Sequence, residues 1–189
     1  MANSIPDFDH NFVLPPHLGD PRGPEQLSPY PCTTLDLIQR FSTSNERRTI
    51  LRGFLDFRER LRATGLTDGF QWLDGSFLED IENNPRELRA PRDLDLVTVY
   101  WGYDQAFQKT VIATFPEFAN PSMAKANFAL DHYPFDAGYS PELTVEYARY
   151  WMLLFSHNRD GVWKGMLKIA LDTPALDNEA RLLLNSTQT

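Results

Sequence analysis

A long amphipathic helix is the strongest periodic feature of the chain. Its apolar positions recur three or four residues apart and therefore share one face: Ile50, Leu51, Phe54, Phe57 and Leu61. Thr43 and Glu46 have the spacing of a capping box, and Gly65 provides a stop after Ala63. The pattern predicts a helix from about Thr43 to Ala63 with one buried face.

Other helices are predicted from capping residues, prolines and shorter apolar stripes. The predicted helices cover residues 33–41, 103–115, 120–126 and 140–155, with a short one near 79–82 and a last one that Asp177 caps. In the helix 103–115, the residues expected to face inward are Ala106, Phe107, Val111 and Ile112.

Runs of β-branched and aromatic residues predict strands between these helices. The runs cover 70–73, 93–100, 128–136 and 162–171. Helices and strands together indicate an α+β fold. The predicted organisation is one domain, residues 33–189, preceded by a proline-rich irregular arm, residues 1–32, that holds 7 of the 14 prolines. The arm either drapes over the domain, with Phe8, Phe12, Val13, Leu14 and Tyr30 as anchors, or docks onto a partner subunit, so a homo-oligomer is plausible.

Composition narrows the class of protein. The chain has 189 residues, a single cysteine and no apolar run of the roughly 20 residues that span a bilayer, so we expect a cytoplasmic protein with no membrane partner. The net charge of −8 opposes broad adhesion to nucleic acid. Seven arginines nevertheless lie between positions 40 and 62, and three more at positions 86, 89 and 92. They either form solvated faces and ion pairs or face a polyanion.

Two aspartates at the start of one predicted strand are the main candidates for chemistry. Residues two apart in a strand point to the same face, so Asp93 and Asp95 project side by side. Such carboxylates repel each other unless a cation lies between them, and their oxygens suit Mg²⁺. The preceding strand ends in Gly75, which permits a tight phosphate turn, and Ser76, whose hydroxyl can bind a phosphate oxygen.

Gly75, Ser76, Asp93 and Asp95 resemble the signature of the nucleotidyltransferase superfamily of the DNA polymerase β type. The signature has Gly-Ser at a strand-to-helix turn, then a strand with Asp-x-Asp, and a third carboxylate on a later strand. The resemblance implies a nucleotidyltransferase-type mixed sheet flanked by helices, a triphosphate held by Gly75 and Ser76, and two Mg²⁺ ions (or Mn²⁺) held by the Asp pair. The spacer 77–92, sixteen residues long, exceeds that of compact members.

Segments 71–80 and 93–98 look more closely like a small bacterial family of nucleotidyltransferase-like proteins, whose genes tend to lie near mobile-element and defence genes. For the third carboxylate that the superfamily has, two residues are available. Asp131 lies within an apolar run, where an unpaired carboxylate is costly, and is favoured as a metal ligand and catalytic residue. Asp136, on the opposite face of the strand, is the alternative.

The closer resemblance extends to the region around residues 157–165. Arg159 and Lys164 are candidates for neutralising the triphosphate, with ordinary strand-edge cations as the alternative. Trp163 either stacks on a base or is buried, and burial is the default. His132 is expected to be structural or on the surface.

The resemblance implies a Mg²⁺-dependent enzyme that transfers a nucleoside monophosphate from an NTP such as ATP to an acceptor hydroxyl. The acceptor is left open between an RNA or DNA 3′ end, a protein side chain and a second nucleotide, in a bacterial defence or toxin–antitoxin context. The alternative function is a catalytically silent subunit that binds and regulates a partner protein encoded by a neighbouring gene. A chance match on an unrelated α+β domain would leave Gly75 far from the Asp pair.

Overall fold

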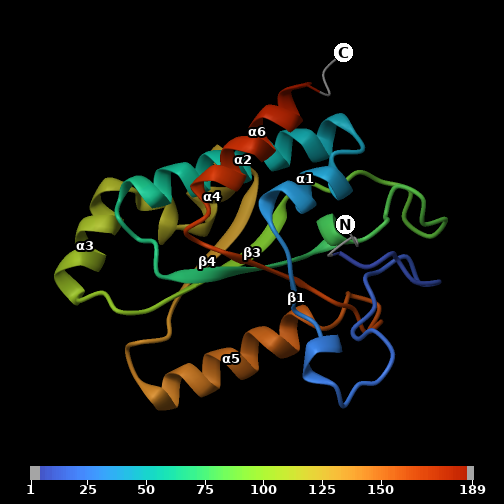
Figure 1. The fold of residues 1–189 in the computed structure, drawn as a ribbon, viewed down its shortest axis with the longest axis horizontal. Helices are drawn as coiled ribbons and strands as arrows, with labels where there is room; N and C mark the ends of the chain where they lie inside the picture. The colour runs from blue at the N-terminus through green and yellow to red at the C-terminus, as the bar shows by residue number, and fades with distance from the viewer. Residues whose placement is uncertain (1–4, 187–189) are drawn as a thin grey trace.

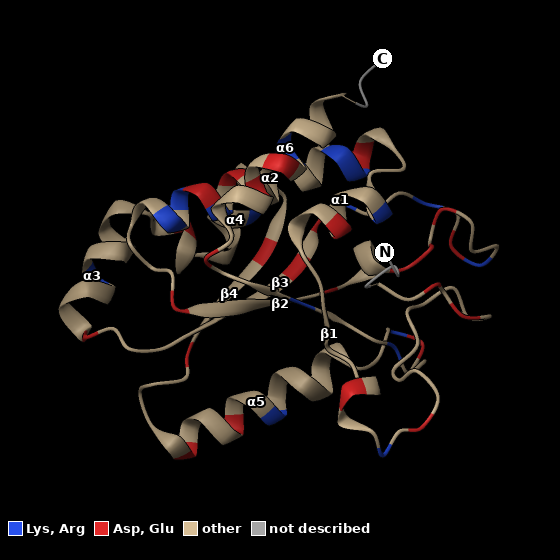
Figure 2. Ribbon diagram, viewed as in Figure 1, with Lys and Arg blue, Asp and Glu red and all other residues tan. Residues whose placement is uncertain are grey.

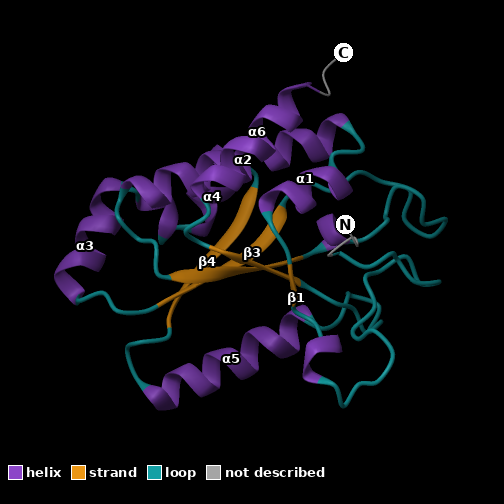
Figure 3. Ribbon diagram, in the orientation of Figure 1, coloured by secondary structure: helices purple, strands orange, loops and turns teal. Residues whose placement is uncertain are grey.

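The computed structural model describes residues 5–186 and contains a mixed five-stranded β-sheet with helices on both faces (Figures 1 and 3). Across the sheet the strands are β1 (Tyr30–Pro31), β5 (Leu167–Ala170), β2 (Gly69–Asp74), β3 (Leu94–Tyr100) and β4 (Leu130–Asp136). The pairs β1–β5 and β3–β4 are parallel, and the other two pairs are antiparallel. The predicted α+β class is therefore confirmed.

One layer of helices covers one face of the sheet, and a single helix lies on the other. Within residues 5–186 the α-helices are α1 (Thr34–Phe41), α2 (Asn45–Ala63), α3 (Gln105–Thr114), α4 (Pro121–Phe128), α5 (Pro141–Phe155) and α6 (Pro174–Ser186). Short 3₁₀ helices are η1 (Pro24–Gln26), η2 (Ser76–Leu78) and η3 (Pro116–Phe118). Figure 1 shows α5 alone below the sheet, opposite the other five α-helices. None of the helices in this range is long and apolar enough to cross a membrane.

Successive side chains of β3 point to opposite faces of the sheet, and each face carries its own apolar cluster. Leu94 and Leu96 point into the larger cluster, which contains the buried face of α2. Val97 and Val99 point the other way and pack with a smaller cluster under α5: Phe135, Trp151, Phe155 and Met166. Asp95 has the same parity as Val97 and Val99, so its carboxylate lies on the face that α5 only partly covers.

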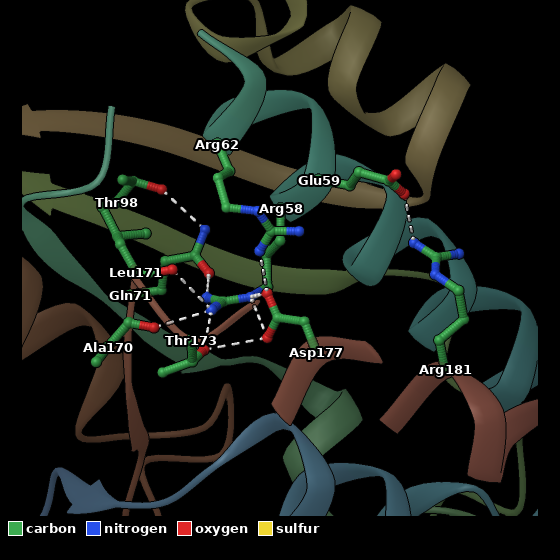
Figure 4. Close-up of polar contacts among 10 residues, drawn as sticks. All are labelled: Arg58, Glu59, Arg62, Gln71, Thr98, Ala170, Leu171, Thr173, Asp177 and Arg181. Atoms are coloured by element: carbon green, nitrogen blue, oxygen red, sulfur yellow. Dashed lines mark hydrogen bonds and ion pairs between the residues drawn. The ribbon is translucent and has the colours of Figure 1, made fainter. Parts of the chain in front are cut away.

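A polar network crosses the larger cluster and joins the sheet to α2 and α6 (Figure 4). The buried guanidinium of Arg58 forms an ion pair with Asp177 and donates to the side chain of Gln71. It also donates to the carbonyls of Ala170 and Leu171 and to the hydroxyl of Thr173. The network continues from the Gln71 amide to Thr98 on β3 and then to the His132 ring on β4. Burial lowers the pKa of His132 to about 3, so this histidine is a neutral core residue.

Residues 5–32 pack against the domain, and part of this segment extends the sheet. Ile5, Val13, Leu14 and Tyr30 are buried, while Phe8 and Phe12 are half-buried. The Tyr30 amide donates to Met166, and the Leu14 carbonyl accepts from Gly165. This segment therefore supports the chain directly after Lys164.

Several predicted helix details need correction. The N-cap of α2 is Ser44 and not Thr43, because the Ser44 hydroxyl accepts from the Arg47 amide. Segment 79–82 forms no helix: Glu79 is extended and pairs with Val13 in an isolated β-bridge, and residues 80–83 form turns. Ala106 and Ile112 of α3 are exposed, and Val111 is the residue of that helix that is buried. The last helix begins at Pro174, which places Asp177 in its first turn, where its carboxylate binds Arg58.

One predicted strand is shorter in the structure. Of the predicted strand 162–171 only β5 forms, because the preceding residues pair with the N-terminal segment and the turn after α5. The last helix, α6, continues through Ser186. Residues 187–189 lie outside the described part of the chain.

Ion pairs within the protein neutralise most of the arginines on α1 and α2, two helices on which Figure 2 marks basic positions in blue. Five of the seven form ion pairs with carboxylates: Arg40, Arg47, Arg58, Arg60 and Arg62. Arg47 is buried and also donates to the carbonyls of Phe77 and Glu79, so it fixes the segment after η2. These contacts agree with the ion-pair interpretation of the cluster.

Candidate functional site

Three carboxylates lie side by side across three neighbouring strands. Asp95 of β3 pairs in register with Asp74 of β2 on one side and with Asp131 of β4 on the other. Directly paired residues of adjacent strands project to the same face of a sheet, a few ångströms apart. Asp93, two residues before Asp95, adds a fourth carboxylate directly before β3. The register thus concentrates negative charge at one end of the sheet face that carries α5.

The charge of this cluster alters its acid–base chemistry. Burial, followed by the negative charges of Asp93, Asp74 and Asp131, raises the pKa of Asp95 to about 7. Burial likewise raises the pKa of Asp74 to about 6, although Lys164 opposes this shift. Because burial and mutual repulsion oppose full ionisation of these carboxyl groups, a bound cation would stabilise the ionised cluster.

The turn between β2 and η2 closes directly over Asp95. Gly75 has φ +83°, a conformation that favours glycine, and a Cβ placed on it would overlap Oδ2 of Asp95. Ser76 begins η2 and is half-buried beside this contact. Gly75, Ser76 and Asp95, distant in the sequence, therefore meet at one place.

We expect Gly75→Ala to destabilise the protein by more than the backbone conformation alone explains. The backbone conformation of Gly75, φ +83° and ψ −178°, is essentially confined to glycine and costs an alanine about 1–3 kcal/mol, and the overlap with Asp95 adds to this. Gly102→Ala is the matched control, because Gly102 has φ +85° and nothing within 4 Å of its Cβ position. The measurement is the free energy of unfolding in urea for both variants. Equal losses would show that the contact with Asp95 is unimportant for stability.

Lys164 stabilises the turn between β2 and η2. Its side chain is only 3% exposed, and Nζ lies 2.8 Å from Glu79 Oε1, 3.1 Å from Asp74 Oδ1 and 3.2 Å from the Gly75 carbonyl oxygen. Burial alone would lower the pKa of Lys164, but the charges of Asp74 and Glu79 raise it, so the ammonium stays charged. This geometry identifies Lys164 as a residue that positions the turn and neutralises Asp74.

The donor set of the cluster fits a divalent cation, which would need a rearrangement of Asp93. Aspartate oxygens are the ligands that Mg²⁺ prefers, and Asp95 and Asp131 face each other across β3 and β4. Asp93 is held by an ion pair with Lys125 of α4. In residues 5–186 no three His, Cys, Asp or Glu side chains already form a ready metal site. Release of Asp93 from Lys125 would supply the third carboxylate.

A cavity of about 150 Å³ lies beside the carboxylates, between β3, β4 and α5. Asp95 and Asp131 form one part of its wall. The remaining wall is aromatic and aliphatic: Tyr133, Tyr150, Trp151, Leu154 and Phe155. Burial, then the charge of Asp131 and a hydrogen bond with it, raises the pKa of Tyr133, which ties this tyrosine to the cluster.

Other residues proposed from the sequence lie elsewhere. Asp136 is at the opposite end of β4, where its carboxylate accepts from Gln108 and from the Gly138 amide. Asp131 is therefore the carboxylate that the fold places beside Asp95. Arg159 is exposed in the turn after α5 and forms no ion pair with the described carboxylates. Trp163 is 65% exposed, so the expectation of burial is wrong.

Asp74 and the aromatic wall of the cavity were not predicted from the sequence. Asp74 directly precedes Gly75, and its place two residues after Trp72 put it on the same strand face, but only the β2–β3 register shows that it meets Asp95. Trp151 and Phe155 are the buried residues of α5, which the sequence predicts as the helix 140–155. The helical pattern does not indicate that these buried residues border an open cavity.

Fold and site together define an α+β domain with a carboxylate cluster at a Gly-Ser turn on one sheet face. The chain belongs to the "Family of unknown function (DUF6932)", whose family model matches residues 6–170. A comparison with curated proteins found no match. A comparison with solved structures found none either. The family match includes every strand of the sheet and the carboxylates Asp74, Asp93, Asp95 and Asp131.

Proposed function

We propose that the protein is a Mg²⁺-dependent nucleotidyltransferase that moves a nucleoside monophosphate from an NTP to an acceptor hydroxyl. The observation that carries this proposal is the contact between Gly75 and Asp95, with Asp131 directly opposite on β4. A chance similarity of short motifs would not require the Gly-Ser turn and the Asp-x-Asp strand to meet. The sequence resemblance and the geometry thus point to the same residues.

The chain's own groups have distinct roles in this reaction. The backbone at Gly75 and the hydroxyl of Ser76 bind oxygens of the β- and γ-phosphates, and Lys164 holds the turn in place. Asp93, Asp95 and Asp131 would hold Mg²⁺, which when bound offsets the charge of the triphosphate and of the leaving pyrophosphate. The acceptor oxygen forms a bond to the α-phosphorus while the bond to pyrophosphate breaks. Asp131 accepts the hydroxyl proton.

Nucleotide binding provides the direct test. We expect one NTP, with Mg²⁺ but not with EDTA, to raise the melting temperature of the wild type, because a ligand at 100 times its Kd adds about 2.7 kcal/mol. Asp93→Ala should lose this shift. Lys125→Ala is the matched control, because it removes the same ion pair but keeps the carboxylate. Absence of a shift with every NTP would contradict the proposal.

A second candidate function is that of a silent subunit that binds a partner protein. The exposed side of α5 favours it, because this helix presents large apolar residues to solvent: Leu143, Val145, Tyr147, Leu153 and Leu154. This function predicts obligate co-purification with a neighbouring gene's product and no nucleotide turnover by either the wild type or the complex. Turnover of an NTP by the purified chain would exclude it.

A further inference from the structure

We propose that the acceptor is an aromatic alcohol without phosphate, of which the tyrosine side chain is the model, and that it binds in the cavity beside Asp131. This inference rests on the proposed nucleotidyl transfer and specifies its acceptor. It follows from the size of the cavity, the nature of its walls and the position of its two carboxylates.

The size of the cavity fits a single aromatic ring. Its volume is about 150 Å³, and an apolar protein cavity of about that size binds benzene. A hydroxyl-bearing ring therefore fits without displacing the strands or α5. A purine nucleotide with its sugar and phosphate is much larger than this space.

The walls of the cavity favour a planar, apolar group. Trp151 is central, with its ring centroid 5.1 Å from that of Tyr133, 4.9 Å from that of Tyr150 and 5.5 Å from that of Phe155. Aromatic rings at these separations attract one another through offset and edge-to-face contacts, and a further ring can join them. Leu154 supplies aliphatic contact on the same side.

The cavity is poorly suited to an acceptor that carries phosphates. Among the described residues that line it, none is a lysine or arginine, and the two charged ones, Asp95 and Asp131, are the carboxylates assigned to Mg²⁺. Proteins bind nucleic-acid ends and nucleotides chiefly through cations that contact their phosphates. Arg149, the cation of α5, is engaged in an ion pair with Glu146. An acceptor without phosphate does not need such a cation.

Asp95 and Asp131 form the part of the cavity wall that the hydroxyl of a bound ring would contact. With the ring against Trp151, the hydroxyl points toward Asp131, which accepts its proton as the new bond to the α-phosphorus forms and pyrophosphate departs. A phenol has a pKa near 10, well below that of an aliphatic alcohol, so this proton transfer is comparatively easy. The products are the nucleotidylated aryl ester, pyrophosphate and a proton, so the reaction balances.

The test uses N-acetyl-L-tyrosinamide as the acceptor, with Mg²⁺ and each α-³²P-labelled NTP. We expect label in the tyrosinamide and none in an oligoribonucleotide with a free 3′ hydroxyl. N-acetyl-L-phenylalaninamide, which lacks the hydroxyl, should compete without becoming labelled. Tyr150→Ala should raise the tyrosinamide concentration needed for half-maximal labelling at least tenfold and leave the NTP thermal shift unchanged. Tyr147→Ala is the matched control, because Tyr147 is equally exposed on α5 (50% against 51%) but does not line the cavity.

The possible failures are distinguishable. Label in the oligoribonucleotide but not in the tyrosinamide would overturn this inference and leave the proposed function standing. An NTP thermal shift without labelling of the tyrosinamide would likewise overturn the inference alone. Absence of any NTP shift would overturn both. Equal effects of Tyr150→Ala and Tyr147→Ala would remove the cavity from the acceptor site.

Discussion

Replacement of Arg58 by alanine is expected to lower the free energy of unfolding by about 3–5 kcal/mol, because it leaves the buried carboxylate of Asp177 without its main partner. The main-chain carbonyls of Ala170 and Leu171 lose a donor at the same time. Arg62 also contacts Asp177 but is partly exposed, so it compensates only in part. For a chain of this length the loss corresponds to a fall of roughly 6–20 °C in melting temperature.

The control for Arg58 lies on the same pair of helices. Arg181 of α6 pairs with Asp56 and Glu59 at the surface of α2, and Figure 4 shows the pair with Glu59 beside the buried network. Because exposed ion pairs contribute about 0–1 kcal/mol, Arg181→Ala should change the melting temperature little. Comparable losses for the two variants would mean that the network around Arg58 does not hold α6 to the sheet.

Most of the helices and strands could be predicted because the hydrophobic periodicity of their sequences is strong. The α2 stripe and the runs that became β2, β3 and β4 were all identified, and α1 was predicted to within a residue. Failures occurred where tertiary contacts decide the outcome. Glu79 is held in extended backbone by its ion pair with Lys164, so the acidic stretch that favoured a helix forms turns. Ala106 and Ile112 are exposed because α3 reaches beyond the edge of the core.

The candidate site was predicted in part, and the missing part depended on register. Spacing alone placed Asp93 beside Asp95, since residues two apart share a strand face. The choice between Asp131 and Asp136 required the β3–β4 pairing, and Asp74 required the β2–β3 pairing. Lys164 was a candidate for neutralising the triphosphate, with an ordinary strand-edge cation as the alternative. Its position under Gly75 could not be inferred from sequence, because it depends on how the segment before β5 packs against the arm.

Replacement of Asp95 by asparagine is expected to abolish nucleotidyl transfer, by about a thousandfold or more, while it stabilises the fold near pH 8. Loss of activity follows from removal of the central carboxylate of the cluster. The gain in stability follows from relief of repulsion, because the pKa of Asp95 is raised to about 7 from an ordinary value of 3.8. Activity retained by this variant, with pyrophosphate release at the wild-type rate, would refute the role of Asp95.

The raised pKa of Asp95 makes the free energy of unfolding depend on pH. A carboxyl whose pKa is raised in the folded state contributes fully to stability below about pH 4, and this contribution is lost as the pH rises through about 7. The wild type in EDTA should therefore lose stability between pH 4 and 8. Asp95→Asn should lose less, with a difference of about 1–3 kcal/mol at pH 8 that vanishes at pH 4.

Asp136→Asn, a change at the other end of β4, should keep both activity and the wild-type pH dependence. Parallel pH profiles for the wild type and Asp95→Asn would show that the carboxylate cluster does not strain the fold, and would remove the electrostatic argument for a bound cation.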